Sequence, residues 1–443
     1  MVISYCSVIE QFTYVIVLYG NELMSPKDVF EETTTYAFGR HLKSRDIDLG
    51  SIIERSELKI VAVTGARRSG KSSVLMLLAQ KLKKDGQRVS YINAEDTRLR
   101  SETLLEEAIK WFGDEGYLII DEITSATNWA GWLARMHEML KGRLRIIVSS
   151  SRSGFSAPPK ALRGRIMTVE VFPLSFKEFL EFNEFKIEPT TAGQGRLEEM
   201  FNEYLRFGGF PEVVLIGEEF EKVTILNDYF KEILGLDVGE LSRADVALVK
   251  LFGRYALDSP YFSASKCLNY MKSVGYKIGK ERILQLEHYS QESYLFFFIP
   301  VFGRSVKDAA QYPRKAYPAD TGFFYAVTGA DDRGRVLESM VFLELRRRLK
   351  PGDEIFYWRS RSGREVDFVI RHGTNVVEAI QVCCDLHDPK TMAREIDSLN
   401  ECLSELKMKK GLVIAMDRTG SRSQDRGFVT VSALDWVLGE GPP

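Results

Sequence analysis

The segment LKIVAVTGARRSGKSSVLMLLAQKLKKDG, Leu58–Gly86, joins an apolar run to an amphipathic helical pattern through a loop that contains two glycines. The apolar run is typical of a buried strand, and the apolar residues after the loop recur at helical spacing. The loop matches the pattern GxxxxGK[ST] from Gly65 to Ser72. In such a loop, backbone N–H groups and the N-terminus of the following helix bind phosphate oxygens, and glycine permits their close approach. The segment therefore predicts a phosphate-binding loop.

The residues of this loop have different expected roles. We expect Lys71 to contact the β- and γ-phosphates of ATP, and the hydroxyl of Ser72 to coordinate Mg²⁺. The residues predicted to hold the nucleotide are Gly65, Ala66, Arg67, Arg68, Ser69, Gly70, Lys71, Ser72 and Ser73. The loop thus predicts ATP as the ligand and Mg²⁺ as its companion ion.

Two carboxylates follow another apolar run, in GYLIIDEI, Gly116–Ile123. We expect Asp121 to complete the Mg²⁺ site with Ser72, because an acid at the end of a strand holds the ion in phosphate-loop proteins. We expect Glu122 to polarise the attacking water as a general base. Lys71 and Glu122 are therefore the main catalytic residues of a predicted ATP-hydrolysing site.

Serine hydroxyls and a cation complete this predicted site. The run LRIIVSSS ends a further strand, so Ser149 or Ser150 is expected to bond the water or the γ-phosphate, and we take Ser150 as the catalytic candidate. The alternative is a simple cap on the strand end. The loop LRGR contains Arg163 and Arg165, and we take Arg165 as an arginine finger that reaches a neighbouring subunit of a homo-oligomer. The alternative is a solvated basic loop.

The patterns along the chain predict an α/β fold in several parts. Up to about Ser175, short apolar runs alternate with helical patterns, which predicts a parallel sheet with helices on both faces. The next segment is helical. SASKCLNYMKSVGYKIGKERILQLEHYSQES then predicts two helices joined at GYKIG, and YLFFFIPVF a strand, which is the outline of a winged helix. From GRVLESMVFLELRRR onward, helices and strands predict a second α/β unit.

Length and composition narrow the class of protein. The chain has 443 residues and 50.5 kDa, which suits two or three domains. The formal net charge is −2 and the pI about 6.3, so that contact with nucleic acid requires local basic patches. Five cysteines without CxxC spacing argue against zinc and disulfides and favour a reducing cytoplasm. We expect no membrane span, since no apolar run approaches about 20 residues.

Residues 1–23 are open to two interpretations. They form either an apolar segment packed on the body, or an extension ahead of a natural start at Met24. A signal peptide is not expected, because the segment lacks a basic start.

A series of motifs makes the resemblance to a known family specific. In order, they are VTGARRSGKSS, YLIIDEI, SSSRSG with LRGR, FPLSFKEFL, YLRFGGFPEVV, KAYPADTGFFYAVTG, GRVLESMVFLELRR, REVDFVI and AIQV. The series is similar to that of prokaryotic, often archaeal, AAA+-type ATP-binding proteins with a C-terminal restriction-endonuclease-like domain. The resemblance covers Ser51 to Asp417.

Patterns and resemblance together divide the chain into five predicted parts. These are an N-terminal extension and leading helix (1–50), a P-loop ATPase domain (51–174), a helical lid-like region (175–236), a winged-helix-like domain (237–330) and a restriction-endonuclease-like domain (331–443).

The resemblance raises the question of nuclease activity. Such a site needs an acid on a helix, an Asp at the end of a strand and a (D/E)xK on the next strand, and Glu338 and Asp367 match the first two. At the third position, the (D/E)xK of the next strand, Gln381 takes the place of the Lys and Ala379 takes the place of the acid. Glu378 is expected to face away, because strand residues alternate between faces. We therefore expect a nuclease-like fold without cleavage.

Two basic regions bear on contact with DNA. In the first, six arginines surround two aromatic residues, which suits phosphate contacts and base stacking. These residues are Arg346, Arg347, Arg348, Arg359, Arg361, Arg364, Tyr357 and Trp358. The second lies in the predicted winged helix and contains Lys277, Lys280 and Arg282. Solvated charged faces are the alternative for both.

Taken together, the sequence predicts a cytoplasmic ATPase that couples ATP hydrolysis to DNA binding or remodelling. One alternative is a nucleotide-gated signalling or scaffold protein that binds another protein. A second alternative is an ATP-dependent, metal-dependent DNA nuclease.

Overall fold

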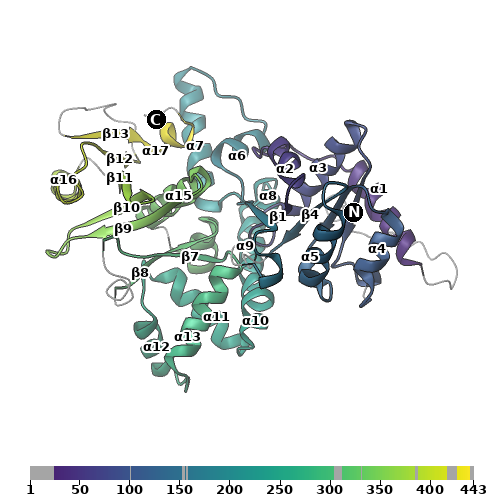
Figure 1. Ribbon diagram of the computed structural model, residues 1–443. Coiled ribbons are helices and arrows are strands. Elements are labelled where there is room, and N and C mark those ends of the chain that lie inside the picture. The colour runs from purple at the N-terminus through teal and green to yellow at the C-terminus, as the bar shows by residue number, and fades with distance from the viewer. Residues whose placement is uncertain are drawn as a thin grey trace, which may run out of the picture.

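Three sheets and the helices around them build the molecule (Figure 1). The computed structural model describes residues 24–99, 101–151, 155, 158–303, 312–330, 332–384, 388–416 and 427–439. The leading segment, residues 1–23, lies outside these ranges. In the described part of the chain, no helix combines the length and the apolar character needed to cross a membrane.

The first sheet has five parallel strands in the order β2-β3-β4-β1-β5. The elements of this nucleotide-binding module are α1 (Pro26–Gly39), α2 (Leu49–Ser56), β1 (Ile60–Thr64), α3 (Lys71–Lys84), β2 (Val89–Asn93), η2 (Thr97–Leu99), α4 (Leu104–Phe112), β3 (Gly116–Asp121), η3 (Ile123–Ser125), α5 (Trp129–Leu140), β4 (Leu144–Ser150), η5 (Lys160–Leu162) and β5 (Ile166–Glu170).

The apolar runs of this module are continuous because its strands are buried on both faces. Alternate residues of β1 belong to different buried clusters: Ile60 and Ala62 pack on one side of the sheet, Val61 and Val63 on the other. The predicted parallel sheet is confirmed.

A helical segment with a small antiparallel sheet, β6-β8-β7, follows. The elements of this middle segment are α6 (Phe176–Phe182), α7 (Thr191–Phe207), α8 (Pro211–Val214), α9 (Glu219–Glu232), the π-helix η6 (Ile233–Gly239), α10 (Glu240–Ser242), α11 (Val246–Asp258), β6 (Tyr261–Phe262), α12 (Ala264–Ser273), α13 (Lys280–Glu292), β7 (Phe296–Ile299), β8 (Arg314–Pro318) and the π-helix η7 (Phe324–Thr328). Helices α12 and α13 lie where the sequence predicts a helix pair.

The last sheet has the order β13-β12-β11-β10-β9, with β9, β10 and β11 antiparallel and β11, β12 and β13 parallel. The elements of this C-terminal module are α15 (Arg333–Arg348), β9 (Asp353–Arg359), β10 (Glu365–His372), β11 (Asn375–Cys383), α16 (Pro389–Glu405), β12 (Gly411–Ala415), β13 (Phe428–Ser432) and α17 (Ala433–Val437). Helices α15 and α16 pack on opposite faces of this sheet, as the two buried clusters on either side of it show.

The middle segment and the C-terminal module share one apolar core. A single buried cluster runs from Leu174 to Val437 and includes Ala66 of the phosphate loop. A buried acid, Asp320, joins distant parts of this core by accepting bonds from the backbone N–H groups of Gly209 (2.7 Å) and Gly322 (2.9 Å). Figure 1 shows the middle segment between the nucleotide-binding module and the C-terminal sheet. The phosphate loop is therefore packed directly against the middle segment.

Candidate functional site

The loop between β1 and α3 requires both of its glycines. Gly65 and Gly70 have φ values of 153° and 98°. A Cβ atom on Gly65 would lie 2.1 Å from the carbonyl oxygen of Val171, and one on Gly70 would lie 2.7 Å from Nη1 of Arg45. Within the loop, the hydroxyl of Ser69 is buried and has no hydrogen-bond partner among the described residues. This hydroxyl is an unused hydrogen-bonding group at the phosphate loop.

Lys71 begins helix α3, and its side chain turns back over the loop. Its ammonium donates to the carbonyl oxygen of Ala66 at 3.2 Å and lies 3.4 Å from Oε1 of Glu122. Both side chains are buried, with 4% and 12% of their surfaces exposed. The structure thus brings together the two residues predicted to lead catalysis.

Asp121 ends β3 and lies beside the first turn of α3. Its carboxylate accepts bonds from the Tyr91 hydroxyl at 2.6 Å and from the hydroxyls of Ser149 and Ser72. Burial and the neighbouring charge of Glu122 raise its pKa. Mg²⁺ in phosphate-loop sites takes one hydroxyl and one carboxylate from the protein, with phosphate and water as the remaining ligands. Ser72 and Asp121 fit that requirement.

Glu122 follows Asp121 with a left-handed φ of 47°. Burial opposes ionisation of its carboxyl group, but Lys71 and two bonds from Ser151 outweigh burial and lower the pKa of Glu122. These bonds come from the backbone N–H and the hydroxyl of Ser151, each at 3.1 Å from Oε2. The carboxylate is therefore held ionised, as a group that polarises water must be.

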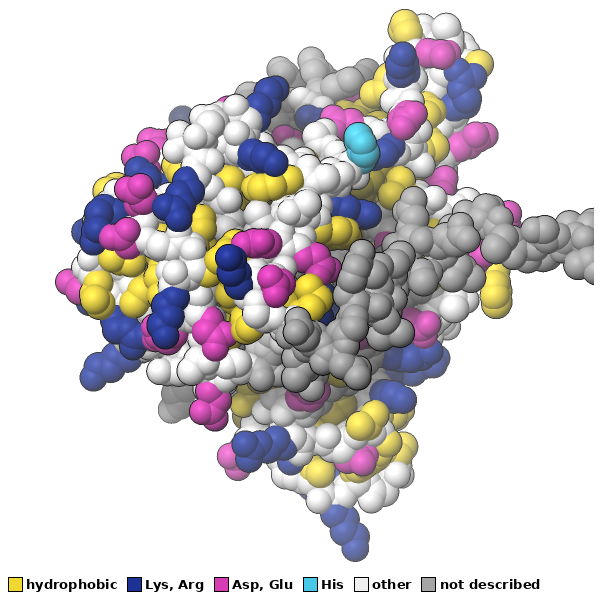
Figure 2. Space-filling view, turned by 90° about the vertical axis from the view of Figure 1, so that its right-hand side faces the viewer, with side chains coloured by type: hydrophobic (Ala, Val, Ile, Leu, Met, Phe, Trp, Pro, Cys, Tyr) yellow, Lys and Arg dark blue, Asp and Glu magenta, His cyan; other side chains and the backbone are white. Residues whose placement is uncertain are grey.

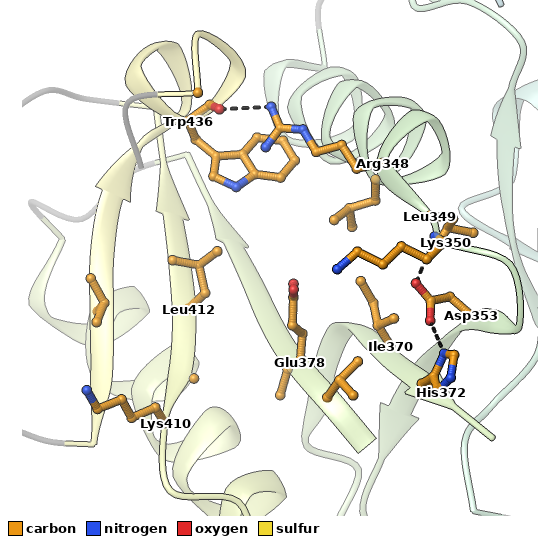
Figure 3. A pocket seen from close by; sticks show the side chains of 16 residues that line it. Arg348, Leu349, Lys350, Asp353, Ile370, His372, Glu378, Lys410, Leu412 and Trp436 are labelled. Carbon is orange, nitrogen blue, oxygen red and sulfur yellow. Dashed lines mark hydrogen bonds and ion pairs between the residues drawn. The ribbon is translucent and has the colours of Figure 1, made fainter. Parts of the chain in front are cut away.

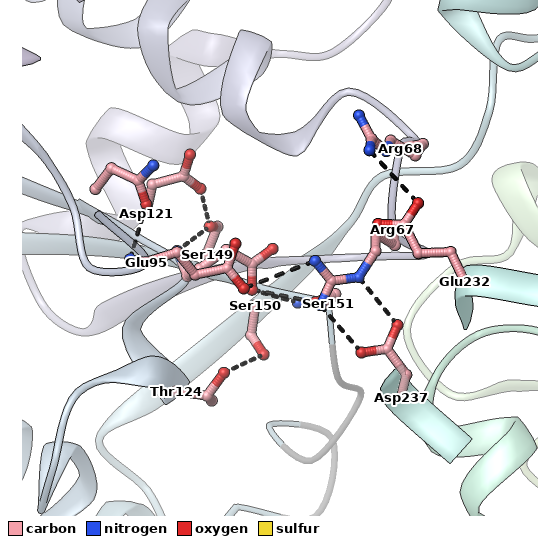
Figure 4. Close-up of polar contacts among 12 residues, drawn as sticks. Arg67, Arg68, Glu95, Asp121, Thr124, Ser149, Ser150, Ser151, Glu232 and Asp237 are labelled. Atoms are coloured by element: carbon pink, nitrogen blue, oxygen red, sulfur yellow. Dashed lines mark hydrogen bonds and ion pairs between the residues drawn. The ribbon is translucent and has the colours of Figure 1, made fainter. Parts of the chain in front are cut away.

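The serines at the end of β4 have different partners (Figure 4). Ser149 donates to Asp121 and accepts a bond from the backbone N–H of Glu122 at 2.8 Å. The hydroxyl of Ser150 lies 3.4 Å from that of Thr124. Of the two serines left open by the sequence, Ser149 touches the acid pair, and the catalytic role assigned to Ser150 stays a prediction.

Two arginines of the loop reach the middle segment (Figure 4). Arg67 makes a two-bond contact with Asp237 of η6, in which Nε and Nη2 are each 3.3 Å from a carboxylate oxygen. Arg67 Nη1 also lies 3.7 Å from Glu95. Arg68 is paired with Glu232 at 3.4 Å. Sequence reasoning missed Asp237, because 170 residues separate it from Arg67 and its own neighbours match no motif.

The predicted arginine finger lies on the surface of the nucleotide-binding module. Arg165 donates to the carbonyl oxygen of Ala161 at 3.1 Å and to Glu138 at 3.2 Å. Its side chain is 38% exposed. A role at the phosphate of a second subunit therefore stays a prediction.

A second polar centre joins the middle segment to the C-terminal module. The ammonium of Lys315, on β8, lies 2.8 Å from Glu338, 2.9 Å from Glu365 and 2.7 Å from Asp367. The Tyr317 hydroxyl also donates to Glu338, at 2.6 Å. Lys315 is buried, and although burial alone lowers the pKa of an ammonium, these carboxylates raise it well above its usual value. The predicted acids Glu338 and Asp367 thus meet, around a lysine that the sequence did not indicate.

The predicted position of Gln381 was wrong. Its side-chain amide donates to Glu395 of α16 at 2.7 Å, on the opposite face of the sheet from Lys315. Ala379 packs on that same face, in the cluster that contains Leu399 of α16, so it does not complete an acid site beside Asp367. Among the described residues, no group of three or more His, Cys, Asp or Glu side chains is arranged to hold a metal ion.

Glu378 lines an open cavity of about 1170 Å³ between α15, α17 and the sheet (Figure 3). In that view its carboxylate points into the cavity, which is also lined by Arg348, Lys350 and Trp436. Asp367 is not one of the residues that line this cavity, and it is paired with Lys315. Strand alternation thus puts Glu378 opposite to Gln381, on the face of α15 and the Lys315 centre, so the expectation that Glu378 faces away from Glu338 and Asp367 was wrong.

The predicted stacking of bases on Tyr357 and Trp358 was wrong. Both side chains are fully buried, at 0% and 1% exposure, because they pack in the cores on the two sides of β9. The arginines on α15 are engaged as well: Arg346 with Glu170, and Arg347 with Glu344. On the face of the molecule drawn in Figure 2, basic and acidic side chains are interspersed.

Family models match successive parts of the chain. They describe an AAA domain at residues 57–180, a domain of unknown function (DUF8612) at 198–334 and a domain of unknown function (DUF4143) at 333–434. The AAA domain contains the phosphate loop and the acids of β3.

Two curated relatives match most of the chain. The uncharacterized protein MJ1544 of Methanocaldococcus jannaschii is 32% identical over 404 residues, which are 88% of this chain and 89% of the relative. An uncharacterized protein of Haemophilus influenzae is 25% identical over 415 residues, 89% of this chain and 98% of the relative.

Solved structures that are similar to parts of this chain include AMPPCP-bound DnaA from Aquifex aeolicus and a RuvB variant from Thermotoga maritima. The first is 15% identical with a TM-score of 0.27 and covers 56% of this chain and 86% of that chain. The second is 15% identical with a TM-score of 0.28 and covers 69% and 95%. Scores this low carry no argument about the function of this chain.

Proposed function

The chain belongs to the same family as its Methanocaldococcus jannaschii relative, a family of AAA-type P-loop ATPases, and on this premise we propose that it binds ATP with Mg²⁺ and hydrolyses it. The observation that carries the proposal is the buried pair of Lys71 and Glu122, which lie 3.4 Å apart where β1 and β3 end. An ammonium at the phosphate loop and an ionised carboxylate beside it are the two charges that γ-phosphate transfer to water needs.

Each residue of this site has a role in the proposed reaction. The loop amides and Lys71 bind the phosphates, and Ser72 and Asp121 would hold Mg²⁺, which neutralises the charge that develops on the phosphate oxygens. Glu122 orients the water and accepts its proton. Ser149 and Ser151 fix the two acids, since their hydroxyls bond Asp121 and Glu122. Ser150 and Arg165 keep their predicted roles at the γ-phosphate, Arg165 from a neighbouring subunit.

Replacement of Lys71 tests ATP binding. Lys71→Ala is expected to weaken ATP binding at least about 100-fold, because loss of one partner of a desolvated charge pair costs several kcal/mol. Titration with ATP and Mg²⁺, followed by calorimetry, measures the change. Lys84→Ala, at the exposed last turn of the same helix, is the control and should bind as the wild type does. Equal affinities of wild type and Lys71→Ala would contradict the assignment.

We further propose that ATP turnover is coupled to DNA through the middle segment. The support is the order α11, β6, α12, α13, β7, β8 with an antiparallel sheet, which is the element order of a winged helix. The predicted contacts Lys277 and Lys280 are exposed, whereas Arg282 donates to the carbonyl oxygen of Ser242 at 2.7 Å. Lys277 and Lys280 are therefore the residues of this group that we expect to contact DNA phosphates.

DNA-dependent turnover tests this coupling. Single-stranded, duplex or branched DNA should raise the ATPase rate several-fold at low salt, and the effect should fall as salt rises, because phosphate contacts release counter-ions. The pair Lys277→Ala and Lys280→Ala should lower the stimulation, whereas Lys141→Ala, an exposed lysine of the nucleotide-binding module, should not. Turnover that is indifferent to every DNA would favour the alternative of a nucleotide-gated scaffold that binds a protein.

For the C-terminal module, we propose a nuclease-like fold that does not cleave DNA. The support is the Lys315 ammonium, which lies among Glu338, Glu365 and Asp367, where a divalent ion would otherwise have to bind. Gln381 is paired with Glu395 and has no basicity with which to activate water. The alternative of an ATP-dependent nuclease therefore finds no support in this centre.

A further inference from the structure

The π-helix η6 carries a carboxylate to the phosphate loop. The Asp237 side chain is only 2% exposed, although no residue of the nucleotide-binding module other than Arg67 bonds to it in the described structure. The two bonds from Arg67 form the forked arrangement in which a guanidinium also recognises phosphate. Asp237 therefore holds Arg67 by the same kind of contact that a phosphate would make.

The charges around the phosphate loop act on Asp237, and Asp237 acts on Arg67. Burial raises the pKa of Asp237, while Arg67 and then Lys71 lower it and Glu122 raises it again. Burial alone would lower the pKa of Arg67, but Asp237 outweighs burial, with smaller effects from Glu95 and Glu122, so the pKa of Arg67 is raised. Arg67 thus joins Asp237 of the middle segment to the phosphate loop, and its Nη1 lies 3.7 Å from Glu95 of the nucleotide-binding module.

Helix η6 connects Asp237 to the core of the middle segment. It packs against α9, α10, α11 and α13, and its residues Ile233, Leu234 and Val238 belong to the large shared core. In a π-helix the backbone hydrogen bonds span five residues, compared with four in an α-helix. Such segments are rare overall and are frequently found at functional sites. A shift of η6 would therefore displace α13, the helix that begins with Lys280.

We propose that Arg67 exchanges Asp237 for the γ-phosphate when ATP binds, and that the release of Asp237 transmits the presence of ATP to the middle segment. The inference rests on the proposed ATP site and adds its means of regulation. ATP brings several negative charges to the loop, and the carboxylate of Asp237 must leave Arg67 or remain beside them at a large repulsive cost. A buried carboxylate without its partner destabilises the helix that carries it. ADP lacks the γ-phosphate and leaves the Arg67–Asp237 contact in place.

Hydrogen–deuterium exchange of residues 229–242 measures this response in the full chain. In the wild type, a non-hydrolysable ATP analogue with Mg²⁺ is expected to speed exchange in η6 about tenfold, because a lost buried ion pair makes local opening easier, and ADP is expected to have no such effect. In Asp237→Asn, exchange in η6 should be fast already and should not depend on the analogue. ATP should also bind this variant more tightly, since the competing charge is gone.

A matched variant separates this contact from a general effect of charge on the helices. Asp228→Asn removes an exposed carboxylate of α9, whose side chain is 66% exposed and, among the described residues, paired only with Lys231 at 3.1 Å. This variant should respond to the analogue as the wild type does. If Asp237→Asn does not fold, Arg67→Lys serves instead, because an ammonium keeps the charge but cannot make the forked contact.

The outcomes distinguish the inference from the function on which it rests. Wild-type protein that hydrolyses ATP but shows equal exchange in η6 with the analogue and with ADP would overturn the inference and leave the proposed function intact. Wild-type protein that binds no ATP would overturn both. A response to the analogue that survives in Asp237→Asn or Arg67→Lys would also overturn the inference, because the signal would then travel by other contacts.

Discussion

Glu122→Gln should bind ATP at least as tightly as the wild type and hydrolyse it about 100-fold more slowly or worse, the loss that removal of a general base produces. The glutamine oxygen can still accept the bonds that Ser151 donates to Oε2, so the side chain keeps its place. The amide has no charge with which to take a proton from water. It also releases Lys71 from its ion pair, so that the ammonium is available to the phosphates.

The measurement combines ATP binding by calorimetry with turnover by phosphate release. Glu95→Gln is the matched control, because Glu95 is an acid of the same site whose ion pair is with Arg67, at 3.7 Å, and not with Lys71. Its turnover should change far less than that of Glu122→Gln. Wild-type turnover by Glu122→Gln would mean that another group acts as the base.

The sequence predicted which residues of the candidate nucleotide site lie together, because that site is built from short, local pieces. The phosphate loop is one contiguous segment, and Asp121 and Glu122 end the apolar strand β3. Their meeting follows from the parallel sheet, in which the carboxyl ends of β1 and β3 reach the same edge with β4 between them. Asp237 could not be found in this way, because it depends on how a helix of the middle segment docks on the loop.

The error at Gln381 has a physical cause in the neighbouring strand. The pairing of β10 with β9 shifts register between Val366 and Val369, which is a bulge or irregularity beside Asp367. A bulge changes the face to which a side chain points, so Asp367 and Gln381 end on opposite faces of the sheet. Alternation along β11 was predicted correctly, but the sequence contains no sign of the register shift in β10.

The role of Lys315 could not be predicted from the sequence either. In the sequence it belongs to the strand segment KAYPADTG of the middle segment, and Asp367 lies 52 residues further on. The pair forms because β8 lies against α15 and the Lys315 side chain reaches Asp367 of β10, and such docking between separate sheets has no local pattern. A buried lysine among acids is therefore a result of the tertiary fold alone.

Lys315→Met should lower the free energy of unfolding by about 3–5 kcal/mol at pH 7, the range observed when one partner of a buried ion network is removed. Methionine keeps the length of the side chain, so the change is mainly one of charge. Urea unfolding measures the shift in midpoint. Lys410→Met is the control: Lys410 is an exposed lysine of the same module, and its replacement should cost less than about 0.5 kcal/mol.

The loss of unfolding free energy in Lys315→Met, relative to the wild type, should also increase from pH 5.5 to pH 8. Burial raises the pKa of Asp367 to about 7, although Lys315 lowers it, so removal of Lys315 should raise this pKa further. A carboxyl group whose pKa is higher in the folded than in the unfolded chain binds more protons when folded, and its contribution to stability falls as pH rises between the two values. The double variant Lys315→Met with Asp367→Asn should therefore recover part of the lost stability. The recovery should be largest at pH 8, because the uncompensated charge of Asp367 is then absent. A variant whose deficit is the same at both pH values, or is not relieved by Asp367→Asn, would show that Lys315 does not act by neutralising Asp367.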